Sequence, residues 1–146
     1  MEQFNNMDFT GFDDNKLENI RHSLLELVNN SIRAHKERQE DAVIILRFTM
    51  TPQELIIILQ DKGGGFDKKS LPYDIDLDVN EIDINDQYFL DYREKHGYIR
   101  FGMGLFITKK AFDTFILKFT ASDGSLNDRY EKGISTGTFI ELRSHI

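Results

Sequence analysis

One amphipathic stretch dominates this sequence: Arg21-His22-Ser23-Leu24-Leu25-Glu26-Leu27-Val28-Asn29-Asn30-Ser31-Ile32-Arg33-Ala34-His35. Its apolar side chains recur every three or four positions, which predicts a helix with one buried stripe; they are Ile20, Leu24, Leu27, Val28 and Ile32. A polar row runs beside that stripe and contains His22, Glu26, Asn30 and Arg33. Ionisable groups against a core cost free energy unless something satisfies them. The row therefore predicts either the wall of a pocket for a metal-chelated anion or the solvated face of an ordinary helix.

The composition indicates a globular chain with one core. It has 146 residues, 40% of them hydrophobic, and no Cys, so a disulfide framework and a thiolate site are excluded. This length predicts a single domain over residues 1–146. We expect a cytoplasmic location, because the N-terminus has no basic and apolar signal pattern and no apolar run is long enough to span a bilayer.

The negative charge is concentrated in one segment. The net charge is −7, and seven acids without a single Lys or Arg lie between Ser70 and Tyr92; the other 18 acids are matched by 18 bases. The net negative charge argues against general nucleic-acid binding. An acidic loop repels phosphate, so we expect the segment over residues 74–91 to be a docking surface for a protein partner.

The order of predicted elements is helix, two strands, a long loop, helix and two strands. We expect a helix over 14–39 with Asp13 or Asp14 as N-cap, a hairpin over 42–49 and 54–60, a helix over 105–112 and strands over 114–121 and 136–142. Residues 1–13 read as a short strand or docked arm, 68–101 as irregular, and 122–133 as a polar excursion or hairpin. This order predicts an α/β (α+β) two-layer sandwich, with helices on one face of a mixed, mainly antiparallel sheet.

Two glycine-rich stretches are candidates for ligand contacts. Asp61-Lys62-Gly63-Gly64-Gly65-Phe66 follows the second predicted strand directly. A carboxylate at a strand tip can accept from an exocyclic amine such as that of adenine, and bare glycines leave room for the ring; a glycine-rich turn capped by Asp61 is the alternative. Gly102-Met103-Gly104 opens a helix and suits an anion. Neither stretch has the pattern of a Walker loop or of a dinucleotide fingerprint.

Taken together, Glu26…Asn30, the Asp61–Phe66 stretch, Gly102-Met103-Gly104-Leu105 and Gly137-Thr138 resemble the superfamily of gyrase, heat-shock chaperone, histidine kinase and mismatch-repair ATPases. The resemblance implies a Bergerat-type site for ATP and Mg²⁺ and an ATP lid over about residues 67–101. It gives Asn30 the metal, Asp61 the adenine amine and Gly102 and Gly104 the phosphate and the lid hinge. The implied cofactor-binding set is Asn30, Arg33, Asp61, Gly63, Gly65, Phe66, Arg100, Gly102, Met103, Gly104, Leu105 and Thr138.

Within that superfamily the sequence is similar to the anti-sigma-factor serine kinases. Glu26 resembles the general base of those kinases, and Arg100-Phe101-Gly102-Met103-Gly104 resembles their phosphate loop. The tract from His22 to Ala34 also resembles the mitochondrial dehydrogenase kinases, in which a His–Glu pair tunes the base, so His22 is a second catalytic candidate. Anti-sigma kinases dimerise through elements ahead of this helix that the sequence does not match, which leaves the oligomeric state open.

Three functions follow as hypotheses. The first is a stand-alone regulatory kinase that phosphorylates Ser or Thr of a partner with Mg-ATP; the second is a histidine-kinase catalytic module acting in trans; the third is a non-catalytic, ATP-gated regulator.

Two smaller patterns are weaker signals of a ligand site. Asp74-x-Asp76-x-Asp78 hints at a calcium loop, although Val79 and Asn85 stand where such a loop has Gly and Glu. Lys109 and Lys110 read as phosphate contacts or as solvated lysines.

Overall fold

A computed structural model describes residues 9–83, 87–95 and 103–146 of the chain. Its elements, in chain order, are α2 (Asp14–Arg38), β1 (Ile45–Met50), β2 (Glu54–Gln60), the 3-10 turns η1 (Lys68–Ser70) and η2 (Val79–Glu81), α3 (Gln87–Lys95), α4 (Met103–Ala111), β3 (Thr114–Ala121), β4 (Leu126–Asn127) and β5 (Ser135–His145). The expected helices and strands occur in the expected order, and η1, η2, α3 and β4 are additional to them. Residues 1–8, most of the predicted N-terminal arm, lie outside the described part.

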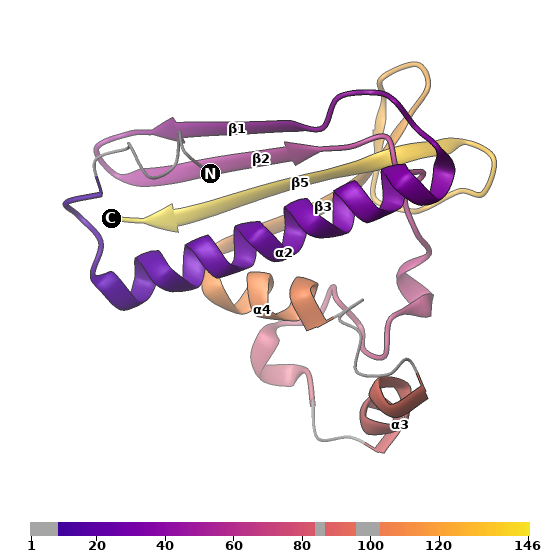
Figure 1. The fold of residues 1–146 in the computed structure, drawn as a ribbon. Coiled ribbons are helices and arrows are strands. Elements are labelled where there is room, and N and C mark those ends of the chain that lie inside the picture. Colours follow the sequence, from indigo (N-terminus) through magenta and orange to yellow (C-terminus); the bar gives the residue numbers. More distant parts are fainter. Residues whose placement is uncertain (1–8, 84–86, 96–102) are drawn as a thin grey trace.

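The strands form one sheet in the order β1-β2-β5-β3-β4 (Figure 1). The predicted sheet was mainly antiparallel, and every pair of described strands is antiparallel. The last strand is longer than the predicted 136–142, so that it pairs along the whole of β2, from Glu54 opposite His145 to Gln60 opposite Phe139. The first strand begins at Ile45 rather than Ala42, because Glu40 Oε1 accepts the N–H of Ala42 and bends the chain there.

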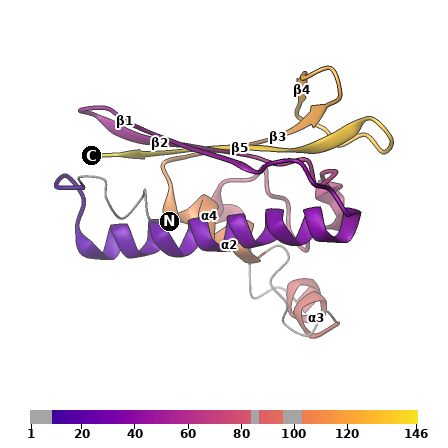
Figure 2. The ribbon, with the colours of Figure 1, turned by 45° about the horizontal axis from the view of Figure 1, so that its top comes forward.

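The molecule has two layers, with α2 and α4 on the same side of the sheet (Figure 2). Strict alternation produces the core: Leu55, Ile57 and Leu59 of β2 are at most 1% exposed and face the helices. Ile140 and Leu142 of β5 and Phe119 of β3 continue this buried layer. The predicted α+β two-layer sandwich is therefore confirmed. No helix of the described ranges has the length and apolarity needed to cross a membrane.

Helix α2 has the predicted ends but a different buried face. Asp13 caps it by accepting the N–H of Lys16 at 2.7 Å, and Gln39 ends it in the left-handed conformation. Ile20, Leu24 and Leu27 are buried as predicted, whereas Ile32 is 39% exposed. Ser31 and His35 are buried instead. The prediction for Ile32 was wrong because the C-terminal half of α2 packs on the polar tips of β2 and β5.

The segment between β2 and α4 is more regular than the sequence indicated. It contains η1, η2 and the helix α3, which lies apart from the two layers (Figure 1). Residues 75–82 form neither a strand nor an α-helix, since a single 3-10 turn begins at Val79. The excursion over 122–133 carries the two-residue strand β4, which pairs with β3 at Thr120 and Phe119.

Candidate functional site

Asp61 lies directly after β2 and is buried, with 7% exposure. Four donors surround its carboxylate. Oδ2 accepts from the hydroxyls of Ser31 at 2.6 Å and Thr138 at 2.8 Å. Oδ1 accepts from the backbone N–H groups of Gly63 at 3.0 Å and Thr138 at 3.1 Å. A carboxylate has about four lone-pair sites, so the group is held in one orientation by elements from three parts of the chain.

A cavity of about 140 Å³ opens beside this carboxylate. We call it the Asp61 pocket. It brings together seven of the predicted cofactor-binding residues: Asn30, Asp61, Gly63, Gly65, Phe66, Leu105 and Thr138. Pockets that enclose a whole drug-sized ligand measure roughly 300 to 1,000 Å³. The Asp61 pocket is therefore of a size to receive a heterocyclic base, while a sugar and phosphates would lie outside it.

Two glycines allow the backbone to approach closely around Asp61. A Cβ on Gly137 would lie 1.9 Å from the backbone oxygen of Asp61, and a Cβ on Gly63 would lie 2.5 Å from Cβ of Ala34. Both distances are far below a normal contact, so only glycine fits without a backbone shift. The glycine-rich stretch after β2 thus packs directly on α2, and it brings Asp61 within reach of Ser31.

Helix α4 meets α2 at a third glycine. A Cβ on Gly104 would lie 3.4 Å from Cβ of Glu26, 3.5 Å from Oε2 of Glu26 and 3.5 Å from Nδ2 of Asn30. The first turn of α4 is therefore beside the two polar side chains of α2 that were singled out in the sequence. Backbone N–H groups at the start of a helix attract anions, and here they lie next to a carboxylate and an amide.

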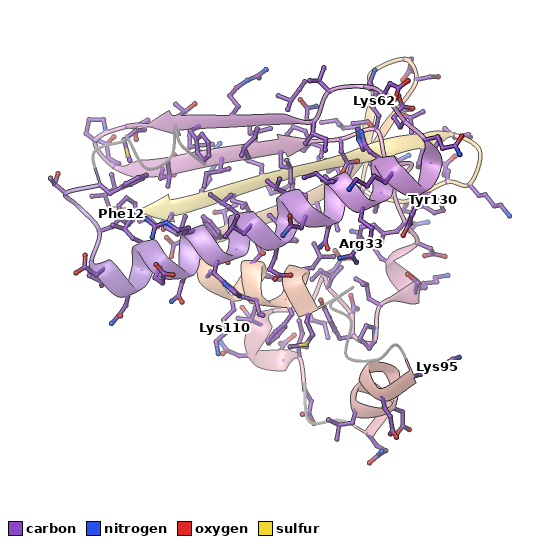
Figure 3. All side chains as sticks on the ribbon, in the orientation of Figure 1. Phe12, Arg33, Lys62, Lys95, Lys110 and Tyr130 are labelled. Atoms are coloured by element: carbon purple, nitrogen blue, oxygen red, sulfur yellow. The ribbon has the colours of Figure 1, made fainter. Side chains whose placement is uncertain are left out.

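The remaining predicted residues lie at the margin. His22 is exposed one turn before Glu26, while Arg33 and Met103 are half-buried; Arg33 projects from α2 on the side of the segment that leads to α3 (Figure 3). Arg100 and Gly102 lie outside the described residues. The predicted polar row thus has an exposed beginning at His22 and a half-buried continuation at Glu26, Asn30 and Arg33.

Two residues of the site were not predicted from the sequence. Ser31 holds the carboxylate of Asp61, and His35, which is 6% exposed, accepts the N–H of Lys62 at Nε2 with a distance of 2.8 Å. Ser31 follows Asn30 directly, and His35 lies one helical turn after Ser31. The sequence analysis did not include them because it placed Ile32 on the buried face. Helical spacing of four from Leu27 to Ser31 and from Ser31 to His35 was the signal that could have found them.

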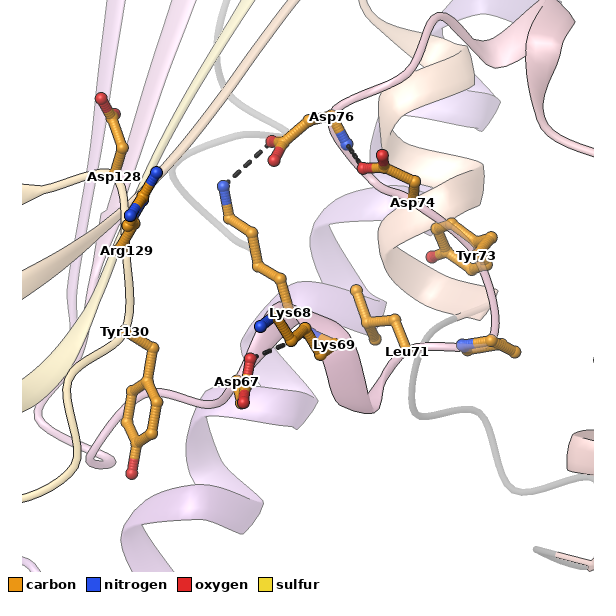
Figure 4. Close-up of a pocket in the computed structure, with 11 residues that line it drawn as sticks. Asp67, Lys68, Lys69, Leu71, Tyr73, Asp74, Asp76, Asp128, Arg129 and Tyr130 are labelled. Carbon is orange, nitrogen blue, oxygen red and sulfur yellow. Dashed lines mark hydrogen bonds and ion pairs between the residues drawn. The ribbon is translucent and has the colours of Figure 1, made fainter.

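A larger cavity of about 790 Å³ is lined by residues of the 67–76 stretch and by Asp128, Arg129 and Tyr130 (Figure 4). It is lined by charges of both signs, including Lys68, Asp76 and Arg129, and contains none of the predicted site residues. The calcium-loop pattern has another role here, because Asp74 and Asp78 accept the N–H groups two positions ahead of them. Within the described ranges, no three or more His, Asp or Glu side chains are grouped to hold a metal.

Comparison with known proteins adds one match. The family model described as histidine kinase-like ATPase domain matches residues 3–126, which is most of the chain. No curated protein and no solved structure matches the sequence. The matched range contains α2, the Asp61 stretch and α4, whereas Thr138, which binds Asp61, lies beyond it.

Proposed function

The chain belongs to the histidine kinase-like ATPase domain family, and from that premise we propose that it is a protein kinase that transfers the γ-phosphoryl group of ATP to Ser or Thr of a partner protein. Binding of ATP follows from the family itself. The anti-sigma-factor type of activity, the acceptor and the roles of individual residues are the proposed part.

The observation that carries the proposal is the contact of Gly104 with both Glu26 and Asn30. A base in the Asp61 pocket has its phosphates outside, since the cavity of about 140 Å³ has no room for them. The first turn of α4 lies next to that cavity, because Leu105 lines the cavity. Its free backbone N–H groups would bind the phosphates. The phosphates and Glu26 then meet at the same place, which is what a general base for phosphoryl transfer requires.

The proposed step is an in-line displacement at the γ-phosphorus. Glu26 takes the proton of the acceptor hydroxyl, the hydroxyl oxygen forms the new bond to phosphorus, and the bond from phosphorus to the β,γ-bridging oxygen breaks, so that ADP leaves. Arg33 and Arg100 would neutralise phosphate charge. His22, one turn before Glu26, would orient the carboxylate or modulate its proton affinity.

Asn30 suits Mg²⁺ because its amide oxygen is a hard ligand and its side chain lines the pocket beside the first turn of α4, where the phosphates would lie. Mg²⁺ in nucleotide sites takes one or two protein oxygens and fills the other positions with phosphate oxygens and water. When bound, the ion would neutralise charge that develops on the transferred group. Asp61 would receive the amine of adenine, for which a hydroxyl rotor such as Ser31 must turn away and free a lone pair.

The test is incubation with γ-labelled ATP and a lysate of the source cells. Acid-stable label on a protein supports transfer to Ser or Thr, and Glu26→Gln should abolish that transfer while ATP affinity changes less than about threefold. Glu18→Gln is the control, because Glu18 is on the same helix and its exposed carboxylate pairs with Arg21. Transfer by Glu26→Gln at the wild-type rate would remove Glu26 from the mechanism.

Two other outcomes would replace the proposal. Acid-labile label would assign the chain to the histidine-kinase modules that act in trans. Absence of any label, together with nucleotide-dependent capture of a partner, would make it an ATP-gated regulator. Either result would leave ATP binding intact.

A further inference from the structure

The first part of the acidic segment is docked on the core. We call residues 71–83 the acidic strap. Three of its apolar side chains are buried, with Leu71 4%, Ile75 2% and Ile82 9% exposed, whereas Leu77 is 39% exposed. Its acids face solvent; Asp74, Asp76, Asp78, Glu81 and Asp83 are all exposed. Burial of the apolar residues supplies the free energy that holds the acidic strap in place.

Lys109 of α4 holds the acidic strap from the other side. Its ammonium group donates hydrogen bonds to the backbone oxygens of Ile75 and Leu77. The sequence predicts either a phosphate contact or a solvated lysine at position 109, and these two hydrogen bonds show that Lys109 is not simply solvated. Lys110, the next residue, is exposed (Figure 3). Two adjacent lysines on one helix thus have different surroundings.

Two further contacts fix the same stretch. Tyr73 packs edge-on against Phe106 of α4 with ring centroids 5.8 Å apart. Lys68 of η1 pairs with Asp76 at 2.9 Å (Figure 4). Because Lys68 is partly buried whereas Asp76 is exposed, this ion pair is screened by solvent. Lys109, in contrast, bonds to the backbone of the acidic strap, at the carbonyl oxygens of Ile75 and Leu77. We call this pair of hydrogen bonds the tether.

Helix α4 contacts the Asp61 pocket and the acidic strap with different residues. Gly104 and Leu105 are at the pocket end, beside Glu26 and Asn30. Lys109 lies five residues further along, a distance of about 7.5 Å at 1.5 Å per residue. A short helix moves as a rigid body. A ligand that fixes the first turn of α4 would therefore also fix the position of Lys109.

We propose that Lys109 is a positioning residue that couples the nucleotide site to the acidic strap. When Lys109 binds the acidic strap, α4 is held against Glu26 and Asn30. Nucleotide binds this state more tightly than the state in which the acidic strap has left Lys109. ATP then keeps the acidic strap closed, and loss of the tether weakens ATP binding by the same factor, because coupling between two sites is reciprocal. The inference rests on ATP binding and not on phosphoryl transfer.

The absence of Cys from the sequence gives a precise test. Lys109→Cys removes the ammonium group, and alkylation of the single thiol with 2-bromoethylamine restores an ammonium at nearly the length of lysine. Lys110→Cys, treated in the same way, is the matched control. Two quantities are measured for each: the rate at which a protease specific for acidic residues cleaves the acidic strap, and the Kd for Mg-ATP by calorimetry. The cleavage sites are unchanged by either substitution.

In the wild type, saturating ATP should slow cleavage at least about fivefold, the lower end of usual coupling factors. Lys109→Cys should be cleaved about tenfold faster without ATP and bind ATP at least about fivefold more weakly. Alkylation should return both values to within about twofold of wild type, and Lys110→Cys should differ from wild type in neither.

Three results would overturn the inference: equal cleavage of Lys109→Cys and Lys110→Cys, faster cleavage with unchanged ATP affinity, or no recovery after alkylation. Hydrogen exchange on the unmodified chain guards against a variant that does not fold. Amides of residues 71–83 must exchange more slowly with ATP than without it, and equal exchange would also overturn the coupling. Failure of phosphoryl transfer would affect none of these readouts.

Discussion

Replacement of Asp61 by Asn changes one atom at the centre of the pocket. The amide oxygen can still accept from the N–H groups of Gly63 and Thr138, which bind Oδ1 at 3.0 and 3.1 Å. The amide nitrogen then faces the hydroxyls of Ser31 and Thr138. Both hydroxyls can rotate to accept instead of donate, so Asp61→Asn should fold, with a loss of about 1 to 2 kcal/mol in the free energy of unfolding.

The effect on nucleotide binding should be much larger. The exocyclic amine of adenine would meet the NH₂ group of the new amide instead of a carboxylate oxygen. Loss of one hydrogen bond to a charged group costs about 2 to 3 kcal/mol, which is roughly a 30- to 150-fold rise in Kd. Inosine triphosphate carries a carbonyl oxygen at the same place. It should therefore bind Asp61→Asn more tightly than it binds the wild type, and the preference for ATP should shrink or reverse.

Calorimetry with ATP and with inosine triphosphate, each with Mg²⁺, measures both effects. Asp113→Asn is the matched control, because it makes the same chemical change at an exposed carboxylate that accepts the N–H of His145 far from the pocket. A folded Asp61→Asn variant whose Kd for ATP is within threefold of wild type would refute the assignment of Asp61 to the adenine amine.

Two more substitutions test the geometry around Asp61. Gly137→Ala should lower the free energy of unfolding by about 3 kcal/mol or more, because its Cβ would lie 1.9 Å from a backbone oxygen. Gly133→Ala, with nothing within 4 Å of the added Cβ, should cost only about 1 to 2 kcal/mol for its positive φ; equal urea midpoints would contradict the close approach. Ser31→Ala should cost about 1 kcal/mol in urea unfolding and raise the Kd for ATP less than about tenfold, since three donors still orient Asp61; a larger loss of affinity than in Asp61→Asn would contradict this.

The features that could be predicted are those whose cause is local in the sequence. Helix α2 has a capping Asp and an apolar period within its own residues, and β1 and β2 have aliphatic runs around a Pro-containing turn. Three successive glycines after β2 lose much conformational entropy on folding, so the sequence predicts that another part of the chain packs closely against them. Gly63 confirms this, since its neighbour is Ala34 of α2.

The features that were missed depend on residues far apart in the chain. Ser31 is a site residue because its hydroxyl donates to the carboxylate of Asp61, which is 30 positions away and directly follows β2. His35 is buried because Lys62, 27 positions away, needs an acceptor for its N–H group. Neither need is visible within α2 alone, where Ile32 is the more hydrophobic choice. In the C-terminal half of α2, tertiary packing therefore buries Ser31 and His35 and leaves Ile32 of the apolar stripe exposed.

The acidity of the segment after Phe66 looked unfavourable for a nucleotide lid, and the docked arrangement removes much of that conflict. The acids of the acidic strap are exposed to solvent, while Leu71, Ile75 and Ile82 are buried. Exposed charges are screened over about 8 to 10 Å at physiological salt. Phosphates at the contact of α2 with α4 would meet the half-buried groups of α2 first. Five of the seven acids in that segment, those of the acidic strap, are thus exposed on a stretch that Lys109 of α4 binds, so they need not oppose ATP binding.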